Sequence, residues 1–224
     1  MVVARGKPGI RAGLNRTAIL AAALRLADER GTDGVSMRAV ADAVGVTPMA
    51  LYPHVGTKAE LLDGLVEAML VEFLPEPSDV PADWRDRMRE IAGGAREMSR
   101  RHPAVFTLLF ARPAVTPGAV GVVDLVYGML LDAGVSGPEV PRLERLVTTF
   151  CLGYAMSEVS GRFGGGRVRT ERGDGAPAHQ RLADVLAAPV DWDAEYAADV
   201  EDLIAVIERV SVAARSPGVG ATVE

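Results

Sequence analysis

Few residues of this chain could do chemistry, and they do not gather into a catalytic or metal-binding set. The three histidines, His54, His102 and His179, share no spacing that is typical of metal ligands. The single cysteine, Cys151, lies in an apolar stretch with no histidine beside it in sequence, so we interpret it as a small core residue and not as a nucleophile. We therefore expect neither a metal site nor a cofactor, and no enzymatic activity.

The glycine-rich run at 161–166 is the remaining candidate for ligand chemistry. No strand pattern precedes it and no Gly-Lys-Ser/Thr follows it, so it does not fit a phosphate-binding loop. We interpret 161–178 as a flexible connector. An enzymatic alternative requires His102, Glu158 and Asp124 to converge in one cleft.

Basic residues near the N-terminus are a stronger signal, because they could hold phosphates. Residues 1–60 contain eight basic and five acidic side chains, whereas residues 61–224 contain 16 and 25. The first basic side chains, which have no acidic neighbour, are Arg5, Lys7, Arg11 and Arg16. We interpret 1–14 as a basic arm that attracts a polyanion such as DNA. The alternative is a solvated tail that only aids solubility.

The composition is that of an ordinary globular protein. The chain has 224 residues, a net charge of −6, 49% hydrophobic residues and 24% charged residues, enough for one large or two modest domains. A single cysteine excludes an intrachain disulfide and fits the reducing cytosol. No apolar run reaches about 18 residues, and the N-terminus lacks a secretory signal. We expect a cytoplasmic protein without a membrane partner.

The elements that must position the basic residues are helices, because apolar residues recur with helical spacing and no alternating strand pattern is present. The predicted helices cover about 16–30, 37–44, 48 onwards, 57–74, 83–101, 103–110, 117–133, 139–162 and 194–214. Asn15, Ser36 and Thr47 are suitable N-caps for the first three. Thr57 and Glu60 form a capping box at the start of the fourth. The sequence thus predicts an all-α fold.

The informative segment lies at 36–58, where two short helices are joined by Gly45 and Val46 alone. Helices joined so tightly cross steeply, with Ala41 at the close approach and Gly45 free to adopt a positive φ. The apolar side chains between them are Val44, Val46 and Leu51. This layout predicts a helix-turn-helix whose second helix enters the major groove, although a plain helical hairpin has the same pattern.

Four polar side chains around this segment are suited to DNA. Lys58 begins the fourth helix, where backbone N–H groups already attract phosphate. Tyr52 and His54 lie at the far end of the recognition helix, placed to contact backbone oxygens. Arg38 begins the preceding helix and can reach a guanine edge or a phosphate.

The run from Val35 to Asp63 closely resembles the DNA-binding domain of tetracycline-repressor-family regulators, and the resemblance extends over about 14–70. The remaining chain resembles the C-terminal domain of the tetracycline-repressor subgroup, through Arg112-Pro113 and 150–154. The resemblance implies a homodimer that binds a palindromic operator through a three-helix domain at 15–60. It also implies an effector-binding and dimerisation domain at 61–224.

Carried over by position, the resemblance assigns DNA contacts to individual residues. Those implied to face the bases are Thr47, Pro48, Met49 and Ala50, with Arg38 at the groove; those implied to face the backbone are Tyr52, His54 and Lys58. Pro53 replaces a frequent aromatic residue and removes an N–H, so we expect the helix to end early. Because few bidentate donors are present, we expect readout through thymine methyls and DNA shape, with Arg38 as the main hydrogen-bonding residue.

The resemblance also bears on the effector. The positions at which tetracycline receptors hold a drug–magnesium complex through a His and a Glu fall at Leu108 and Ser157, which implies an apolar pocket without metal. The residues expected to line it are Leu74, Ile91, Met98, Leu108, Leu109, Val126, Phe150 and Tyr154. Each fits a plain core position equally well.

Two apolar stripes near the C-terminus fit either a core face or a dimer seam, and the resemblance favours the seam. The stripes consist of Leu143, Leu146, Val147, Phe150 and Tyr154, and of Val200, Leu203, Ile204, Ile207 and Val210. The sequence thus suggests a dimeric repressor that a small hydrophobic effector releases from DNA. The alternatives are an all-helical enzyme and a helical adaptor without DNA affinity.

Overall fold

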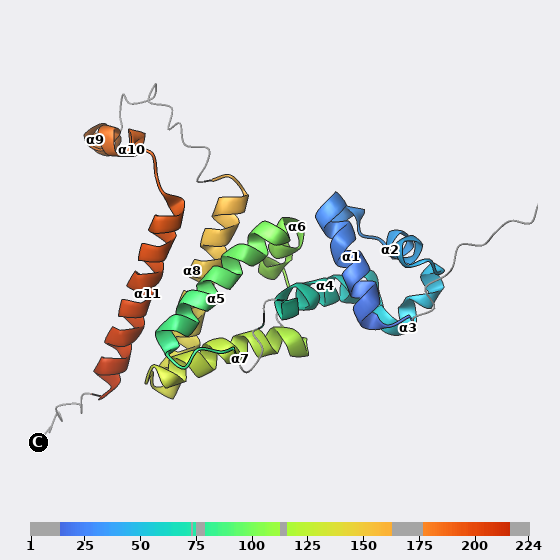
Figure 1. Ribbon diagram of the computed structural model, residues 1–224, viewed down its shortest axis with the longest axis horizontal. Helices are drawn as coiled ribbons and strands as arrows, with labels where there is room; N and C mark the ends of the chain where they lie inside the picture. Colours follow the sequence, from blue (N-terminus) through green and yellow to red (C-terminus); the bar gives the residue numbers. More distant parts are fainter. Residues whose placement is uncertain (1–13, 73, 75–78, 113–115, 163–176, 216–224) are drawn as a thin grey trace, which may run out of the picture. The chain divides into compact units, whose positions relative to one another are not determined.

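The computed structural model describes residues 14–72, 74, 79–112, 116–162 and 177–215. Helices and connecting turns make up these residues, with no strand among them, which confirms the all-α prediction (Figure 1). The basic arm before residue 14 and most of the glycine-rich connector, 163–176, lie outside the described residues. Within the described residues, no helix combines the length and apolar character needed to span a bilayer.

The chain divides into two compact units. The first unit contains Met1–Glu72 and Ala104–Ala119, and the second contains Phe73–Pro103 and Val120–Glu224. The sequence placed a boundary at residue 60, whereas the first unit keeps all of the following helix and gains a segment from much later in the chain.

Six helical elements of the first unit come from the described residues of its N-terminal part. Five of them are α1 (Arg16–Arg30), α2 (Met37–Val44), the 3₁₀ turn η2 (Pro48–Ala50), α3 (Tyr52–Val55) and α4 (Lys58–Glu72). Helix α1 packs against both α2 and α4, around fully buried side chains that include Ile19, Leu61 and Leu65. The sixth, the 3₁₀ turn η1 (Thr32–Gly34), joins α1 to α2. From the later segment come most of α6 (Pro103–Phe106) and the 3₁₀ turn η3 (Thr107–Phe110).

The predicted N-caps explain where α1, α2 and α4 begin. Asn15 Oδ1 accepts a hydrogen bond from Ala18 N at 2.8 Å, and Ser36 Oγ accepts one from Ala39 N at 3.1 Å. Each satisfies a backbone donor that has no partner inside its helix. The bounds predicted for the first two helices, 16–30 and 37–44, are confirmed.

The third helix differs from the prediction. Instead of one helix from Pro48, a 3₁₀ turn is followed by the four-residue α3, and in the described structure the Thr47 side chain accepts no capping hydrogen bond. Pro53 lies in the first turn of α3, where its missing N–H is harmless. It therefore does not end the helix. The helix ends at Gly56, whose φ of 61° breaks the helical backbone.

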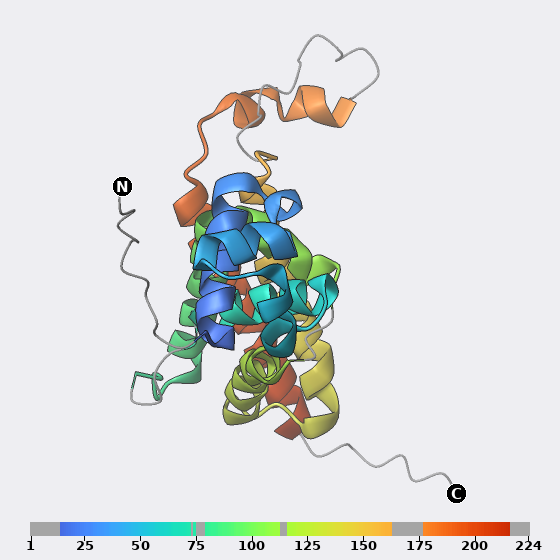
Figure 2. The ribbon, with the colours of Figure 1, turned by 90° about the vertical axis from the view of Figure 1, so that its right-hand side faces the viewer.

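The second unit is built from long helices. They are α5 (Trp84–Arg101), α7 (Pro117–Asp132), α8 (Val140–Val159) and α11 (Trp192–Arg215), with α7 entering the unit at Val120. Helix α5 packs against α8 and α11. Three short elements were not predicted: η4 (Gly137–Glu139), α9 (Pro177–Arg181) and α10 (Ala183–Ala187). Helices α9 and α10 lie beyond the N-terminal end of α11 in both views (Figures 1 and 2).

The two apolar stripes form the core of the second unit. Leu143 and Val147 of α8 and Ile207 of α11 are at most 1% exposed and belong to one hydrophobic cluster. The interpretation of these stripes as a dimer seam is therefore wrong for most of their residues, because the chain buries them itself. Phe150 and Val210 are partly buried against the same cluster, and Leu146 is 41% exposed.

Candidate nucleic-acid interface

The turn between α2 and η2 has the predicted geometry. Gly45 adopts the left-handed conformation with φ 76° and ψ 33°, and Val46 N donates to Ala41 O at 2.9 Å. Ala41 and Leu51 are fully buried in the angle between the elements, whereas Val44 and Val46 are half-buried. A Cβ at position 45 would meet nothing within 4 Å, so the backbone conformation alone favours glycine there.

The turn presents an exposed tip. Met49 is 74% exposed and Tyr52 is 46% exposed, although both are large side chains that water solvates poorly. Thr47 and Pro48 are also exposed, and Ala50 is half-buried. Large apolar side chains projecting from a tight helical turn fit a surface that is covered by a partner.

Lys58 and the turn before it are held by the capping box. Thr57 N donates to Glu60 Oε2 at 2.8 Å, and Glu60 N donates to Thr57 Oγ1 at 3.3 Å. The hydrogen bonds from the Thr57 backbone and side chain lower the pKa of the Glu60 carboxyl. A Cβ on Gly56 would lie 2.4 Å from Glu60 Oε2, so the carboxylate occupies the space that glycine leaves. The capping box and Gly56 thus restrict the conformation of the turn between His54 and Lys58. Lys58 is exposed at the first position of α4.

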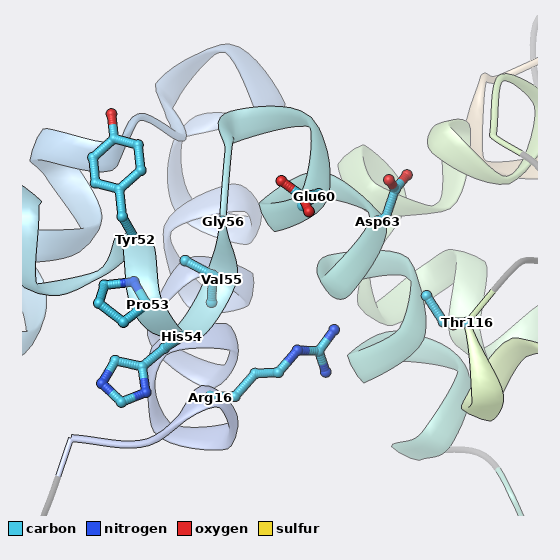
Figure 3. Close-up of a pocket in the computed structure, with 9 residues that line it drawn as sticks. All are labelled: Arg16, Tyr52, Pro53, His54, Val55, Gly56, Glu60, Asp63 and Thr116. Carbon is cyan, nitrogen blue, oxygen red and sulfur yellow. The ribbon is translucent and has the colours of Figure 1, made fainter.

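A groove of about 510 Å³ lies behind α3 (Figure 3). Tyr52, Pro53 and His54 line one side of it, and Asp63 and Thr116 line the opposite side. Arg16 enters from α1, where its guanidinium pairs with Glu67 of α4 at 2.7 Å. The sequence counted Arg16 among the basic side chains near the N-terminus and also placed it at the start of the first helix; the structure confirms that place, with part of its charge neutralised by Glu67.

Arg112 contributes a contact that the sequence did not indicate. Its Nη1 donates to the Ala59 carbonyl oxygen at 3.0 Å and also pairs with the Asp63 carboxylate. In the sequence, Arg112 is notable only as part of the Arg112-Pro113 pair that contributes to the family resemblance. A separation of 49 residues along the chain leaves no periodic signal for this pair.

The eight predicted DNA-binding residues all belong to the first unit. Arg38, like Lys58, is exposed, and His54 is half-buried at the groove. The assignment of each of these residues to bases or backbone stays a prediction.

The eight predicted effector residues are divided between the two units. Leu108 and Leu109 belong to the first unit, and the other six belong to the second. In the second unit, Val126 and Tyr154 are buried in the hydrophobic cluster, with Ile91 and Phe150 packed against it. Met98 is also buried, and Leu74 is half-buried. The burial of these six residues is therefore compatible with a role in the hydrophobic core as well as with a role in lining an effector pocket.

Three aromatic side chains contact one another in this core. The rings of Phe150 and Tyr196 are stacked with centroids 6.1 Å apart, and Tyr154 lies 4.5 Å from Tyr196. The Tyr196 hydroxyl donates to the Ala92 carbonyl at 2.8 Å. Burial raises the pKa of the neighbouring Cys151 thiol to about 11, which agrees with its interpretation as a core residue.

A buried arginine joins three helices beside these rings. Arg96 is 7% exposed; its Nε donates to Glu158 at 2.6 Å and its Nη2 pairs with Asp193 at 2.7 Å. Arg100, one helical turn later on α5, also pairs with Glu158 at 2.6 Å. The Arg96 guanidinium and then Arg100 hold the pKa of the Glu158 carboxyl below its ordinary value. In the sequence, the four-residue spacing of Arg96 and Arg100 indicates only that both lie on the same face of a helix.

Among the described residues, no group of three His, Cys, Asp or Glu side chains could hold a metal ion. Glu158, which the enzymatic alternative requires as an acid–base group, is engaged with Arg96 and Arg100.

Comparisons with known proteins point in one direction. Residues 19–65 match the family described as "Bacterial regulatory proteins, tetR family", and residues 76–199 match "Tetracyclin repressor-like, C-terminal domain". The class A tetracycline repressor of transposon 1721 from Escherichia coli is 31% identical over 184 residues, which cover 80% of each chain. The repressor DrrR1 of Streptomyces coeruleorubidus is 29% identical over 160 residues, which cover 69% of this chain and 57% of DrrR1.

Solved structures agree. Apo ActR from Streptomyces coelicolor superposes with a TM-score of 0.76 at 25% identity, covering 91% of this chain and 99% of ActR. ActR in complex with (S)-DNPA gives a TM-score of 0.73 at 25% identity, covering 89% of this chain and 100% of that one. The match to DrrR1 and that to a regulator of Saccharopolyspora erythraea span less than two thirds of those two relatives, 57% and 61%.

Proposed function

The chain belongs to the TetR family of transcriptional regulators, and from this premise we propose that it is a homodimeric repressor of a palindromic DNA operator. We propose further that a small hydrophobic effector releases it from DNA, and that it acts in the cytoplasm. As a regulator it is not an enzyme, so the all-helical enzyme considered above is excluded. The observation that carries the proposal is the turn at Gly45, which holds an exposed Met49 and Tyr52 close in sequence to Lys58.

In this proposal the tip of the first unit reads the bases. Thr47, Pro48, Met49 and Ala50 offer methyl and methylene groups suited to thymine methyls, and Arg38 supplies the bidentate hydrogen bonds. Tyr52, His54 and Lys58 contact backbone oxygens and fix the register of the helix without reading sequence. Two copies related by a twofold axis then place their tips about 34–36 Å apart, one turn of the duplex.

The effector is proposed to bind among the apolar residues of the C-terminal part. ActR, a structural neighbour, has been solved in complex with (S)-DNPA, which supports a ligand of this kind. Leu108 and Ser157 stand where tetracycline receptors use a His and a Glu, which argues against a drug–magnesium complex. Any effector must bind one separation of the two tips better than the other, because equal affinity shifts no equilibrium.

The DNA proposal is tested by measuring affinity for a selected operator and for random duplex. Lys58→Ala should weaken binding to both and lower the slope of log affinity against log salt by about 0.9 for each bound chain. Tyr52→Phe should weaken binding to both alike, whereas Arg38→Ala should also relax base preference at one position by about 1–3 kcal/mol.

Arg142→Ala is the control for the loss of a surface positive charge, because Arg142 lies in the second unit, where its Nε pairs with Glu139 at 2.6 Å. Unchanged affinity in all three test variants would refute the assignment. A chain that binds no random duplex even at low salt would instead be the helical adaptor, and a strictly monomeric chain would refute the dimer.

A further inference from the structure

The first unit includes a segment that follows α5 in sequence, Ala104–Ala119. Close packing joins this segment to α4: a Cβ on Gly118 would lie 2.7 Å from Val71 Cγ2 and 3.0 Å from Glu67 Cγ. Thr116 lines the same groove as Tyr52 and His54. The body that carries the proposed DNA contacts is therefore discontinuous in sequence.

Arg112 is the polar contact between this segment and the start of α4. Its Nη1 donates to the carbonyl of Ala59 and pairs with the carboxylate of Asp63, four residues later. One guanidinium thus spans the first turn of α4, directly after Lys58. The side chains of Arg112 and Asp63 are 22% and 31% exposed, so water screens the pair less than a fully exposed one.

We propose that Arg112 is a positioning residue of the DNA-binding surface, which acts on DNA through Lys58 without touching it. Helix ends fray, and any freedom that the capping box leaves in the first turn of α4 would have to be lost when Lys58 binds a phosphate. Arg112 reduces that freedom before DNA binds, because its guanidinium holds the Ala59 carbonyl and the Asp63 carboxylate. The inference rests on the proposed DNA binding.

A double-mutant cycle tests the inference. Arg112→Ala should weaken operator binding by about threefold to tenfold, in line with the loss of a partly exposed charge-assisted pair. In the Lys58→Ala background the same change should cost less than twofold, because the side chain that it positions is gone. In an Arg38→Ala background, Arg112→Ala should still weaken operator binding by about threefold to tenfold. The reason is that Arg38 lies on α2, which Arg112 does not contact through its hydrogen bonds to Ala59 and Asp63.

Two further variants separate positioning from general destabilisation. Arg112→Lys keeps one donor and should recover part of the affinity, and Asp63→Asn should weaken binding less than Arg112→Ala, because the Ala59 contact survives. Thermal unfolding of each variant, with Arg142→Ala as the control for removing a surface charge, shows whether the change is local. A fall in affinity that only follows the loss of stability would overturn the inference.

The possible failures are distinguishable. Full additivity of Arg112→Ala and Lys58→Ala, with a reduced salt slope in each, would show that Arg112 contacts phosphate itself and would overturn the positioning role. Wild-type affinity in Arg112→Ala alongside a clear loss in Lys58→Ala would refute the inference and leave the proposed function intact. Absence of DNA binding by the unmodified chain would refute the proposed function itself.

Discussion

Two glycines shape the proposed DNA-binding surface for different physical reasons. Gly45 has a φ of 76° and open space around the position of a Cβ, so only its backbone conformation favours glycine. Gly56 has a φ of 61°, and a Cβ there would also collide with the Glu60 carboxylate at 2.4 Å. A substitution at Gly45 therefore measures backbone strain alone.

Gly45→Ala should lower the free energy of unfolding by about 1 kcal/mol, because a left-handed backbone strains any residue with a Cβ. Gly93→Ala is the control, since Gly93 lies inside α5 with nothing within 4 Å of an added Cβ. It should raise stability by about 0.5–1 kcal/mol. Urea unfolding of both variants measures the difference, and equal shifts in the same direction would contradict this account of the turn.

Glu158→Gln should lower stability at pH 7 by about 1–2 kcal/mol, because nearly buried Arg96 loses its strongest partner. Since Arg96 and Arg100 lower the pKa of Glu158 below its ordinary 4.5, this contribution is complete above that value. It disappears as the pH falls through the lowered pKa and the wild-type carboxylate is protonated. Urea unfolding from pH 7 down to pH 3 should therefore show the two proteins converging.

Glu97→Gln supplies the comparison for that experiment, because Glu97 pairs with Arg101 through exposed side chains. Its cost should be a few tenths of a kcal/mol at most. A gap between wild type and Glu158→Gln that widens on acidification would show that the sign of the linkage is wrong.

At the scale of elements, the helices whose ends depend on neighbouring residues were predictable. Asn15, Ser36 and the Thr57–Glu60 capping box each satisfy backbone donors within three residues, so the sequence contains the whole interaction. The break between η2 and α3 was not predictable from Pro48 and Thr47, because nearby packing decides between one helix and two short turns.

Interactions between distant elements could not be predicted for a related reason. The apolar stripes of α8 and α11 have the same spacing whether a second copy or the chain's own core covers them, and only the packing of α5 on both shows which. The exposed tip at Met49 and Tyr52 followed from local pattern and family resemblance. The contact of Arg112 with Asp63 crosses 49 residues and required the fold.

The cap of α2 gives a prediction at this scale. Ser36→Ala should destabilise the protein by about 1 kcal/mol, because Ala39 N loses its acceptor at the start of a helix of only eight residues. Ser36→Asp keeps an acceptor and adds a charge that the helix dipole favours, so its stability should match or exceed that of wild type. Thermal unfolding compares the two, and equal losses in both variants would show that the cap does not hold α2.

At the scale of the whole molecule, positive charge is concentrated near the N-terminal end of the sequence. Residues 1–60 have three more basic than acidic side chains, whereas the chain as a whole has a net charge of −6. A polyanion is therefore attracted to the N-terminal end and repelled elsewhere. In the proposed function this asymmetry attracts the DNA phosphates to the N-terminal residues, and the attraction is independent of the base sequence.

Replacing Arg5, Lys7 and Arg11 together with Gln tests this charge distribution. If each holds one phosphate per chain, the slope of log affinity against log salt should fall by about 2.7 for each bound chain. The ratio of operator to random-duplex affinity should stay unchanged, because phosphate contacts carry no sequence information. Fluorescence anisotropy from 50 to 300 mM salt measures both quantities. An unchanged slope would identify the arm as a solubility tail, and a changed ratio would mean that it reads bases in the groove.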